Sequence, residues 1–239
     1  MQILGGGKHV GTRATAVPAE VMALLLLLCQ VHARAAQLPA EVELALKSPD
    51  AFVSGTYDLP ARLAVIEKLL ASPLIMAGLW QAYAFNPQYQ VRMNGRSIHI
   101  DDPTGIEGDI IPVERSPNRY VYYGTGNLNH ELVPAFGGRM AIVLTLIPKD
   151  AGASCRIDVY IRADSRTLGF LARGLFPLLK DRVVNRMTLN VHDVGSILND
   201  VSTAPEQTAA RLKRKEDAAA LIALLCPALR PETIAKTKQ

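Results

Sequence analysis

The sequence predicts an α+β fold in which an antiparallel sheet of about six to seven strands wraps on one long helix near the C-terminus. Residues 88–162 alternate between apolar and polar side chains and are divided by turn residues at regular intervals, as antiparallel strands are. Residues 165–201 instead repeat apolar side chains every three or four positions, which is the period of a helix. The order of the two patterns places the closing helix after the sheet.

Three shorter elements precede the sheet pattern. Residues 51–57 read as a strand, and Pro60 suits the first turn of a short helix that ends before Ser72. Ser72 is a good N-cap residue and Pro73 fits the first helical position, so a second short helix is expected over residues 73–83. The expected order is therefore a strand, two short helices and then the sheet.

The sheet region divides into strands at its turn residues. Asn94-Gly95 is a strong hairpin signal, and residues 126–138 are expected to form a long loop. The expected strands cover residues 89–93, 97–101, 109–115, 119–125, 139–147 and 154–162. This is a meander of about six strands.

Alternation in the last two strands assigns the buried face of the sheet. The apolar side chains of one face are Met140, Ile142, Leu144, Leu146, Cys155, Ile157, Val159 and Ile161. The other face carries polar side chains such as Arg156 and Asp158. One face is therefore expected to be buried and the other to be wet.

The long helix presents a continuous apolar stripe to that buried face. The stripe consists of Leu168, Leu171, Leu175, Leu179, Val183, Met187, Val191, Val194, Leu198 and Val201. Gly174 and Pro177 interrupt the regular helix, so a kink or a break is expected near residue 176.

The N-terminus has the pattern of a signal peptide over residues 1–35. Residues 21–29 are a short apolar run, and Ala33-Arg34-Ala35 matches the small-x-small pattern of a cleavage site. The chain is expected to be exported to the periplasm or secreted. A lipoprotein acylated at Cys29 is the weaker alternative, because Leu28 before it is not small. Residues 36–50 form a lead-in segment, residues 51–204 the main domain and residues 205–239 a basic amphipathic helix or tail.

Cys155 and Cys226 remain if Cys29 leaves with the leader. An even number of cysteines in an exported protein allows a Cys155–Cys226 disulfide. Two buried free thiols that act as small apolar side chains are the alternative. The sequence leaves both open.

The distribution of charge argues against nucleic-acid binding. The net charge of +4 comes from the two ends, with +2 in residues 1–35 and +3 in residues 205–239, which leaves −1 for the body. A nucleic-acid reader needs a basic face. The basic tail could make peripheral contact with an anionic membrane, but a solvated helix face is the simpler interpretation.

The order of elements resembles the helix-grip fold of the START-like or SRPBCC superfamily. The resemblance covers residues 50–201 and rests on the strand and helix over residues 52–70, the paired strands at 139–148 and 154–162, and the helix after Ser165. It implies a cavity between sheet and long helix. Members of this superfamily typically hold a lipid or another hydrophobic small molecule there, and some are enzymes.

Residues with catalytic potential are few in the expected mature chain. Its histidines are His99, His130 and His192, and their spacing matches no zinc motif, so no metal or cofactor is expected. His130 and Glu131, in the expected loop, are the best acid-base candidates. His99 alternates with isoleucines and is expected to face solvent.

These observations favour an exported, non-catalytic protein that binds a hydrophobic small molecule or lipid. The ligand-binding residues expected are Trp80, Met93, Tyr122, Phe136, Met140, Ile142, Leu144, Ile157, Val159, Leu175, Leu179 and Val183. Every one of them could equally be plain core. Two alternatives stay open, which are a cyclase-like or isomerase-like enzyme of the same fold and a structural protein of the cell envelope.

Overall fold

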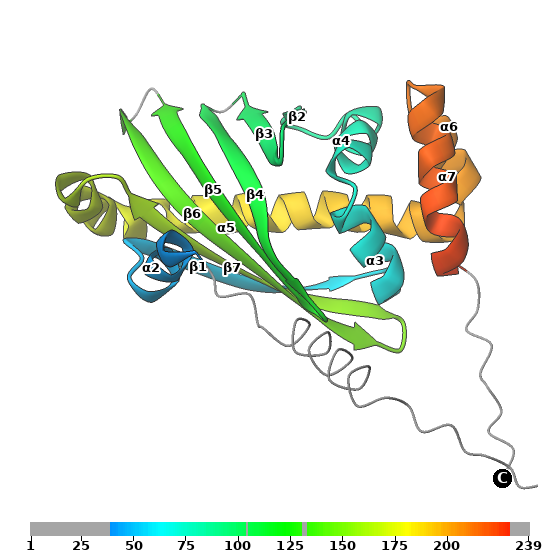
Figure 1. Cartoon of the computed structure of the whole chain (residues 1–239), viewed down its shortest axis with the longest axis horizontal. Coiled ribbons are helices and arrows are strands. Elements are labelled where there is room, and N and C mark those ends of the chain that lie inside the picture. Colours follow the sequence, from blue (N-terminus) through cyan, green and yellow to red (C-terminus); the bar gives the residue numbers. More distant parts are fainter. Residues whose placement is uncertain (1–38, 104, 131–132, 230–239) are drawn as a thin grey trace, which may run out of the picture. The chain divides into compact units, whose positions relative to one another are not determined.

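A computed structural model describes residues 39–103, 105–130 and 133–229 of the chain. Its helices are α2 (Ala40–Lys47), α3 (Leu63–Leu70), α4 (Pro73–Ala82), α5 (Arg166–Thr203), α6 (Pro205–Ala210) and α7 (Lys215–Leu229) (Figure 1). Its strands are β1 (Ala51–Leu59), β2 (Gln90–Asn94), β3 (Ser97–Asp102), β4 (Ile106–Ser116), β5 (Arg119–His130), β6 (Val133–Lys149) and β7 (Gly152–Ala163). The leader expected over residues 1–35, and Cys29 within it, lie outside the described residues.

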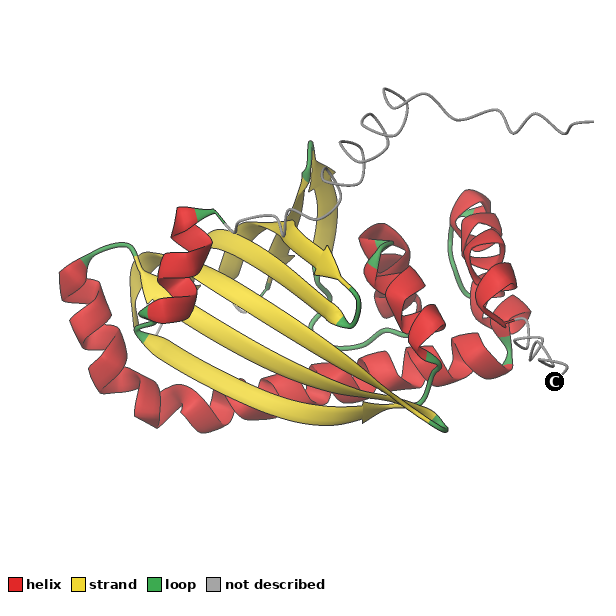
Figure 2. Ribbon diagram, turned by 60° about the horizontal axis from the view of Figure 1, so that its bottom comes forward, coloured by secondary structure: helices red, strands yellow, loops and turns green. Residues whose placement is uncertain are grey.

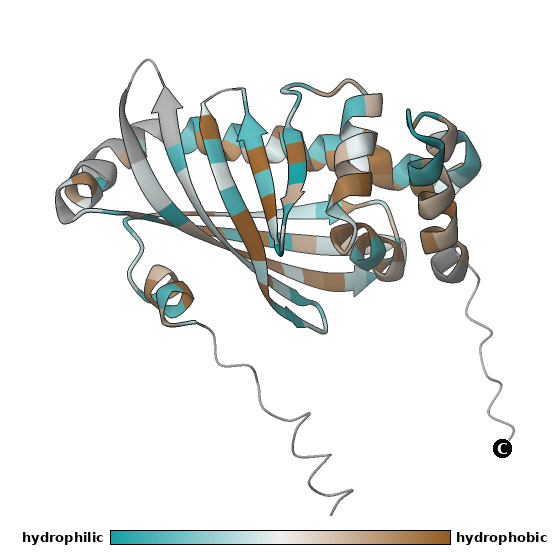
Figure 3. Ribbon diagram, turned by 45° about the horizontal axis from the view of Figure 1, so that its top comes forward, coloured by the Kyte–Doolittle hydropathy of each residue, from teal (hydrophilic) through white to brown (hydrophobic). Residues whose placement is uncertain are grey.

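The strands form one seven-stranded sheet in the order β1-β7-β6-β5-β4-β3-β2. Neighbouring strands are antiparallel throughout, and β1 pairs with β7 at one edge of the sheet. Hydrophobic and hydrophilic residues alternate along several strands (Figure 3). The predicted α+β fold with a sheet of six to seven strands is confirmed.

Helix α5 runs along one face of the sheet (Figure 2). It contains 38 residues and begins at the N-cap Ser165, whose hydroxyl accepts a hydrogen bond from the Leu168 amide at 3.2 Å. The helix bends in its N-terminal part, which contains Pro177 (Figure 2). Because proline removes one helical hydrogen bond and clashes with the preceding turn, a kink without a break is its usual result.

The main core lies between the inner face of the sheet and helices α3, α5 and α7. Ile197, Leu198 and Val201 of α5 are almost fully buried in it. Leu221 and Leu225 of α7 are equally buried in the same core. The sequence analysis placed a boundary after residue 204 and assigned the residues beyond it to a tail. In the structure, helix α7 of that tail contributes to the core of the main domain.

A second, smaller core lies on the opposite face of the sheet. Val42 and Ala45 of α2 are fully buried there against Val121 and Ala141. The phenol of Tyr123 donates to Glu41 of α2 at 3.2 Å. The expectation that this face is uniformly wet is wrong, because the lead-in segment forms a helix that covers part of it.

Strands β5 and β6 run through the stretch that the sequence assigns to a loop at residues 126–138. Glycines there allow close approach of neighbouring strands. A Cβ atom on Gly126 would lie 2.5 Å from the carbonyl oxygen of Glu107, and one on Gly137 would lie 2.5 Å from the Asp164 carboxylate. The loop prediction is wrong because Gly126 allows β5 to pack closely on β4, and Gly137 leaves room for the Asp164 side chain, so neither glycine marks a turn.

The described helices are short or polar relative to a membrane-spanning helix. None of them alone is long and apolar enough to cross a bilayer. Helices α3 and α4 reach that length and hydropathy only as a pair, and they are bent by 98° at the break between them.

Candidate functional site

An apolar pocket of about 440 Å³ lies between the inner face of the sheet and helices α3, α4 and α5. Its volume falls in the range of about 300 to 1,000 Å³ that is usual for small-molecule sites. It is lined by Leu59, Ile66, Leu69, Leu70, Pro73, Met76, Ala77, Trp80, Tyr89, Val91, Ile98, Ile100, Ile110, Tyr122, Ile142, Leu144, Leu146, Cys155, Ile157, Asn190, Val191, Val194 and Leu198. We call it the inner pocket.

The strand register brings the sheet residues of the inner pocket together. Ile98 pairs with Ile110, Tyr122 with Ile142, and Leu144 with Ile157. Because alternate residues of a strand share a face, these partners all project toward α5. The apolar wall therefore extends across β3 to β7.

One end of the inner pocket carries a polar cluster centred on the phenol of Tyr89. Arg186 donates to its oxygen from Nε at 3.2 Å and from Nη2 at 2.9 Å. Asn190 donates to the same oxygen from Nδ2 at 2.9 Å. Arg186 and Asn190 are four residues apart and so share one face of α5. Asp102 lies behind Arg186, with 3.9 Å between its carboxylate and Nη2.

Aromatic contacts hold Tyr89 in place. Its ring lies 5.3 Å from that of Trp80, and the Arg186 guanidinium stands 5.6 Å from its centroid. The Trp80 indole donates to the carbonyl oxygen of Pro87 at 2.8 Å. The only tryptophan of the chain is thus fixed in the pocket wall.

Tyr122 stands between the inner pocket and a second pocket of about 460 Å³. Burial raises the pKa of the Tyr122 phenol, and the nearby Arg115 partly offsets that rise. The phenol is therefore neutral at physiological pH.

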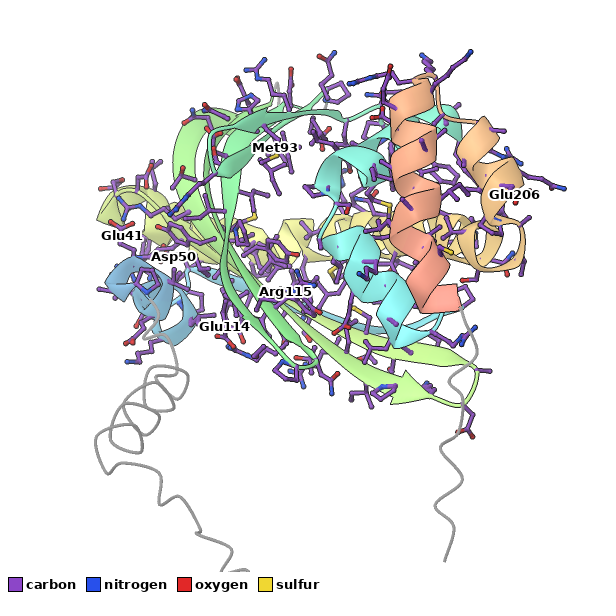
Figure 4. The ribbon with its side chains drawn as sticks, turned by 45° about the vertical axis from the view of Figure 1, so that its right-hand side comes forward. Glu41, Asp50, Met93, Glu114, Arg115 and Glu206 are labelled. Carbon is purple, nitrogen blue, oxygen red and sulfur yellow. The ribbon has the colours of Figure 1, made fainter. Side chains whose placement is uncertain are left out.

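The second pocket is more polar than the inner one. Met93, Glu114 and Arg115 line it and are labelled in Figure 4. A hydrogen bond from Arg119 lowers the pKa of the Glu114 carboxyl, although partial burial opposes this effect. Of its charged lining residues, Glu114 pairs with Arg119 and Arg115 stands 5.7 Å from the centroid of the Tyr120 ring.

The structure brings some of the predicted site residues together and separates others. Five of them line the inner pocket, namely Trp80, Tyr122, Ile142, Leu144 and Ile157. Met93 lines the second pocket, and Met140, Val159 and Val183 line neither. The side chains of Phe136, Leu175 and Leu179 lie outside the described residues. The ligand-binding role of the whole set stays a prediction.

Sequence reasoning found Tyr122 but missed Tyr89, Asn190 and the contribution of β2 to β4 to the inner pocket. The alternation along the strands could have identified Ile98, Ile100 and Ile110 as residues of the inner face. The helical period could have identified Asn190, because it follows Met187 by three positions and precedes Val194 by four, and is thus a polar residue on an apolar stripe. No sequence pattern identifies Tyr89, since only the folded chain brings it to α5.

The sequence analysis also made predictions for His99, His130 and Glu131. His130 and Glu131 have side chains outside the described part of the chain. His99 lies on the outer face, as expected, but it is buried, between Glu107 at 3.3 Å and Asp109 at 3.5 Å. The expectation that it faces solvent is wrong, because these neighbouring side chains cover it. Within the described ranges, no group of metal-ligating residues is found.

The two cysteines occupy different environments. Cys155 is buried in the main core, Cys226 is exposed on α7, and both thiols are free. The structure contains no Cys155–Cys226 disulfide, and the alternative of two buried free thiols fits Cys155 but not the exposed Cys226. Burial raises the pKa of the Cys155 thiol to about 11.

Comparisons with known proteins concern the fold alone. No protein-family model and no protein of curated function matches the sequence. A conserved protein from Geobacillus kaustophilus is 12% identical, with 63% of this chain and 97% of that chain covered and a TM-score of 0.49. A START superfamily protein from Mycobacterium smegmatis is 10% identical, with 63% and 98% covered and a TM-score of 0.43. Protein Ms6760 from the same organism is 13% identical, with 69% and 98% covered and a TM-score of 0.42.

The fold assignment rests on the chain's own architecture. A strand, two short helices and an antiparallel meander precede one long helix, and the first strand lies at the edge of the sheet beside the last. The chain has the helix-grip fold of START-like proteins. Its inner pocket lies between the sheet and the long helix.

Proposed function

We propose that this protein binds a hydrophobic small molecule or lipid in the inner pocket. The observation that carries the proposal is a wall of aliphatic and aromatic side chains around a volume of about 440 Å³. Burying each methylene group of a ligand against such a wall contributes about 0.8 kcal/mol. A chain of ten or so carbon atoms would therefore supply enough free energy for firm binding.

The composition of the wall supports the binding of an apolar molecule. Among the described side chains that line the inner pocket, none is His, Asp, Glu, Lys or Arg, and most are aliphatic. The polar groups that line it, on Tyr89, Tyr122 and Asn190, are suited to orienting a ligand.

Trp80 supplies a direct test, because it is the only tryptophan and lies in the pocket wall. Titration with undecyl methyl ether, an uncharged apolar probe, is expected to change the fluorescence of Trp80 to saturation. Val194→Phe fills the pocket from α5 and is expected to abolish the change, whereas Asn199→Phe, at an exposed position on the same helix, keeps it. Absence of a saturable change in the wild-type protein, with this ether and with dodecanol alike, would refute the proposal.

We also propose that the protein works after export. The apolar run at residues 21–29 and the Ala33-Arg34-Ala35 pattern support this proposal. The mature protein is then expected to have the mass of a chain that begins at Ala36. A mature protein that retains residues 1–35 would count against it.

A further inference from the structure

One buried polar atom in the inner pocket has no hydrogen-bond partner. It is the side-chain oxygen Oδ1 of Asn190. Asn190 lines the inner pocket, among side chains that are otherwise almost all apolar. Leaving a buried acceptor unpaired costs about 1 to 3 kcal/mol, so such an atom in a binding pocket calls for a partner.

In the structure, the side-chain nitrogen of Asn190 is engaged and its oxygen is not. Its Nδ2 donates to the Tyr89 hydroxyl at 2.9 Å, and that hydroxyl is held in turn by Arg186. Tyr89 is itself packed on Trp80, with 5.3 Å between the ring centroids. The amide nitrogen is thus committed to a rigid neighbour, and the oxygen is the group left for a molecule in the pocket.

An acceptor in this position selects a ligand that carries a donor. We propose that the ligand of the inner pocket is an uncharged apolar molecule with a hydroxyl group, which donates a hydrogen bond to Oδ1 of Asn190. This inference rests on the proposed function and adds to it the chemistry of the ligand's polar end. The aliphatic wall takes the remainder of the molecule.

A carboxylate fits the same end poorly. An ionised carboxylate has only hydrogen-bond acceptors. Placed against Oδ1 of Asn190, which is also an acceptor, it would leave both the carboxylate oxygen and Oδ1 without a hydrogen bond. The positive charge of Arg186 is already engaged, because the guanidinium donates twice to Tyr89 and lies 3.9 Å from the Asp102 carboxylate. The carboxylate of a ligand would therefore gain little attraction from Arg186, because Asp102 already offsets most of its positive charge.

The test uses two isomers of one composition on the full chain. Dodecanol carries a hydroxyl group, whereas undecyl methyl ether has the same atoms but no donor. Dissociation constants for both are measured by Trp80 fluorescence in the wild-type protein, in Asn190→Leu and in Asn199→Leu. The last variant makes the same change on α5 at an exposed residue that does not line the inner pocket.

The preference for alcohol over ether is expected to fall about tenfold in Asn190→Leu and to stay at the wild-type value in Asn199→Leu. An unchanged preference in Asn190→Leu, with both probes still bound, would overturn this inference and leave the proposed function standing. Tighter binding of dodecanoate than of dodecanol by the wild-type protein would also overturn it. Failure of both uncharged probes to bind would refute the proposed function itself. Circular dichroism of each variant establishes that it is folded.

Discussion

The amide of Asn190 donates a 2.9 Å hydrogen bond to the phenol of Tyr89. This contact joins the long helix to the segment just before β2, at the polar end of the inner pocket. Arg186 adds two donors to the same oxygen. The pocket thus has a defined polar end and an apolar body.

Removal of the Tyr89 hydroxyl is expected to destabilise the protein. Tyr89→Phe leaves the donors of Arg186 and Asn190 without their acceptor, which costs about 1 to 3 kcal/mol in the free energy of unfolding. Urea denaturation measures it. Tyr57→Phe is the matched control, because the Tyr57 phenol has only a 3.4 Å exposed contact with Thr188, and it is expected to cost less than about 0.5 kcal/mol. Equal costs for the two variants would contradict the role given to Tyr89.

Helix α7 is expected to be required for the stability of the domain. Leu221→Ala removes a fully buried side chain from the main core and is expected to cost about 2 to 5 kcal/mol. Leu189→Ala on α5, where the side chain is exposed, is expected to change the free energy of unfolding by less than about 0.5 kcal/mol. A Leu221→Ala variant as stable as the wild-type protein would show that α7 does not belong to the core.

Helix α2 is expected to behave as part of the fold. Val42→Asp places a charge among buried apolar residues and is expected to cost on the order of 3 kcal/mol or to detach the helix. The same change at the exposed Leu44 is expected to have little effect. Hydrogen exchange of β5 and β6 provides the readout. Similar exchange in both variants would mean that α2 does not protect the outer face.

Cys155 is expected to make stability fall on the alkaline side. Its thiol has a pKa of about 11 in the folded protein against the ordinary value of 9.0, so between these values the folded state retains a proton that the unfolded state has lost. The stabilisation is complete below pH 9 and decreases as the pH rises to about 11. Denaturation of wild-type and Cys155→Ala proteins across this range measures the effect, because tyrosines contribute equally to both. Parallel curves would contradict the prediction.

The same burial predicts a difference in thiol reactivity. Cys226 is exposed and is expected to react with iodoacetamide in the native protein, whereas Cys155 is expected to react only after unfolding. Peptide mapping by mass spectrometry identifies the labelled residue. Labelling of Cys155 at the rate of Cys226 would show that its site is open to solvent.

The sequence predicted the fold where one period dominates a long stretch. Alternation at Met140–Leu146 placed the inner face of β6, and the stripe through Val191, Val194 and Leu198 placed that of α5. Glycines misled the prediction, because Gly126 allows close packing of strands and Gly137 makes room for the Asp164 side chain, but both look like turn residues in a sequence. The sequence analysis did not predict that α2 covers part of the outer face of the sheet, because the residues that it packs against, such as Val121, lie far along the chain.

The candidate site was only partly predictable for the same reason. Ile142, Leu144 and Ile157 follow from alternation alone. The position of the pocket depends on where α3 and α4 pack, and no local pattern determines that packing. The polar end depends on Tyr89 meeting Asn190, which are 101 residues apart.

Native mass spectrometry of the full chain with dodecanol tests the central claim most directly. The wild-type protein is expected to gain the mass of one dodecanol molecule, and Val194→Phe, which fills the inner pocket, is expected to gain none. A wild-type protein that binds no dodecanol, or a variant that binds it equally, would contradict the assignment of the inner pocket as a binding site for hydrophobic molecules.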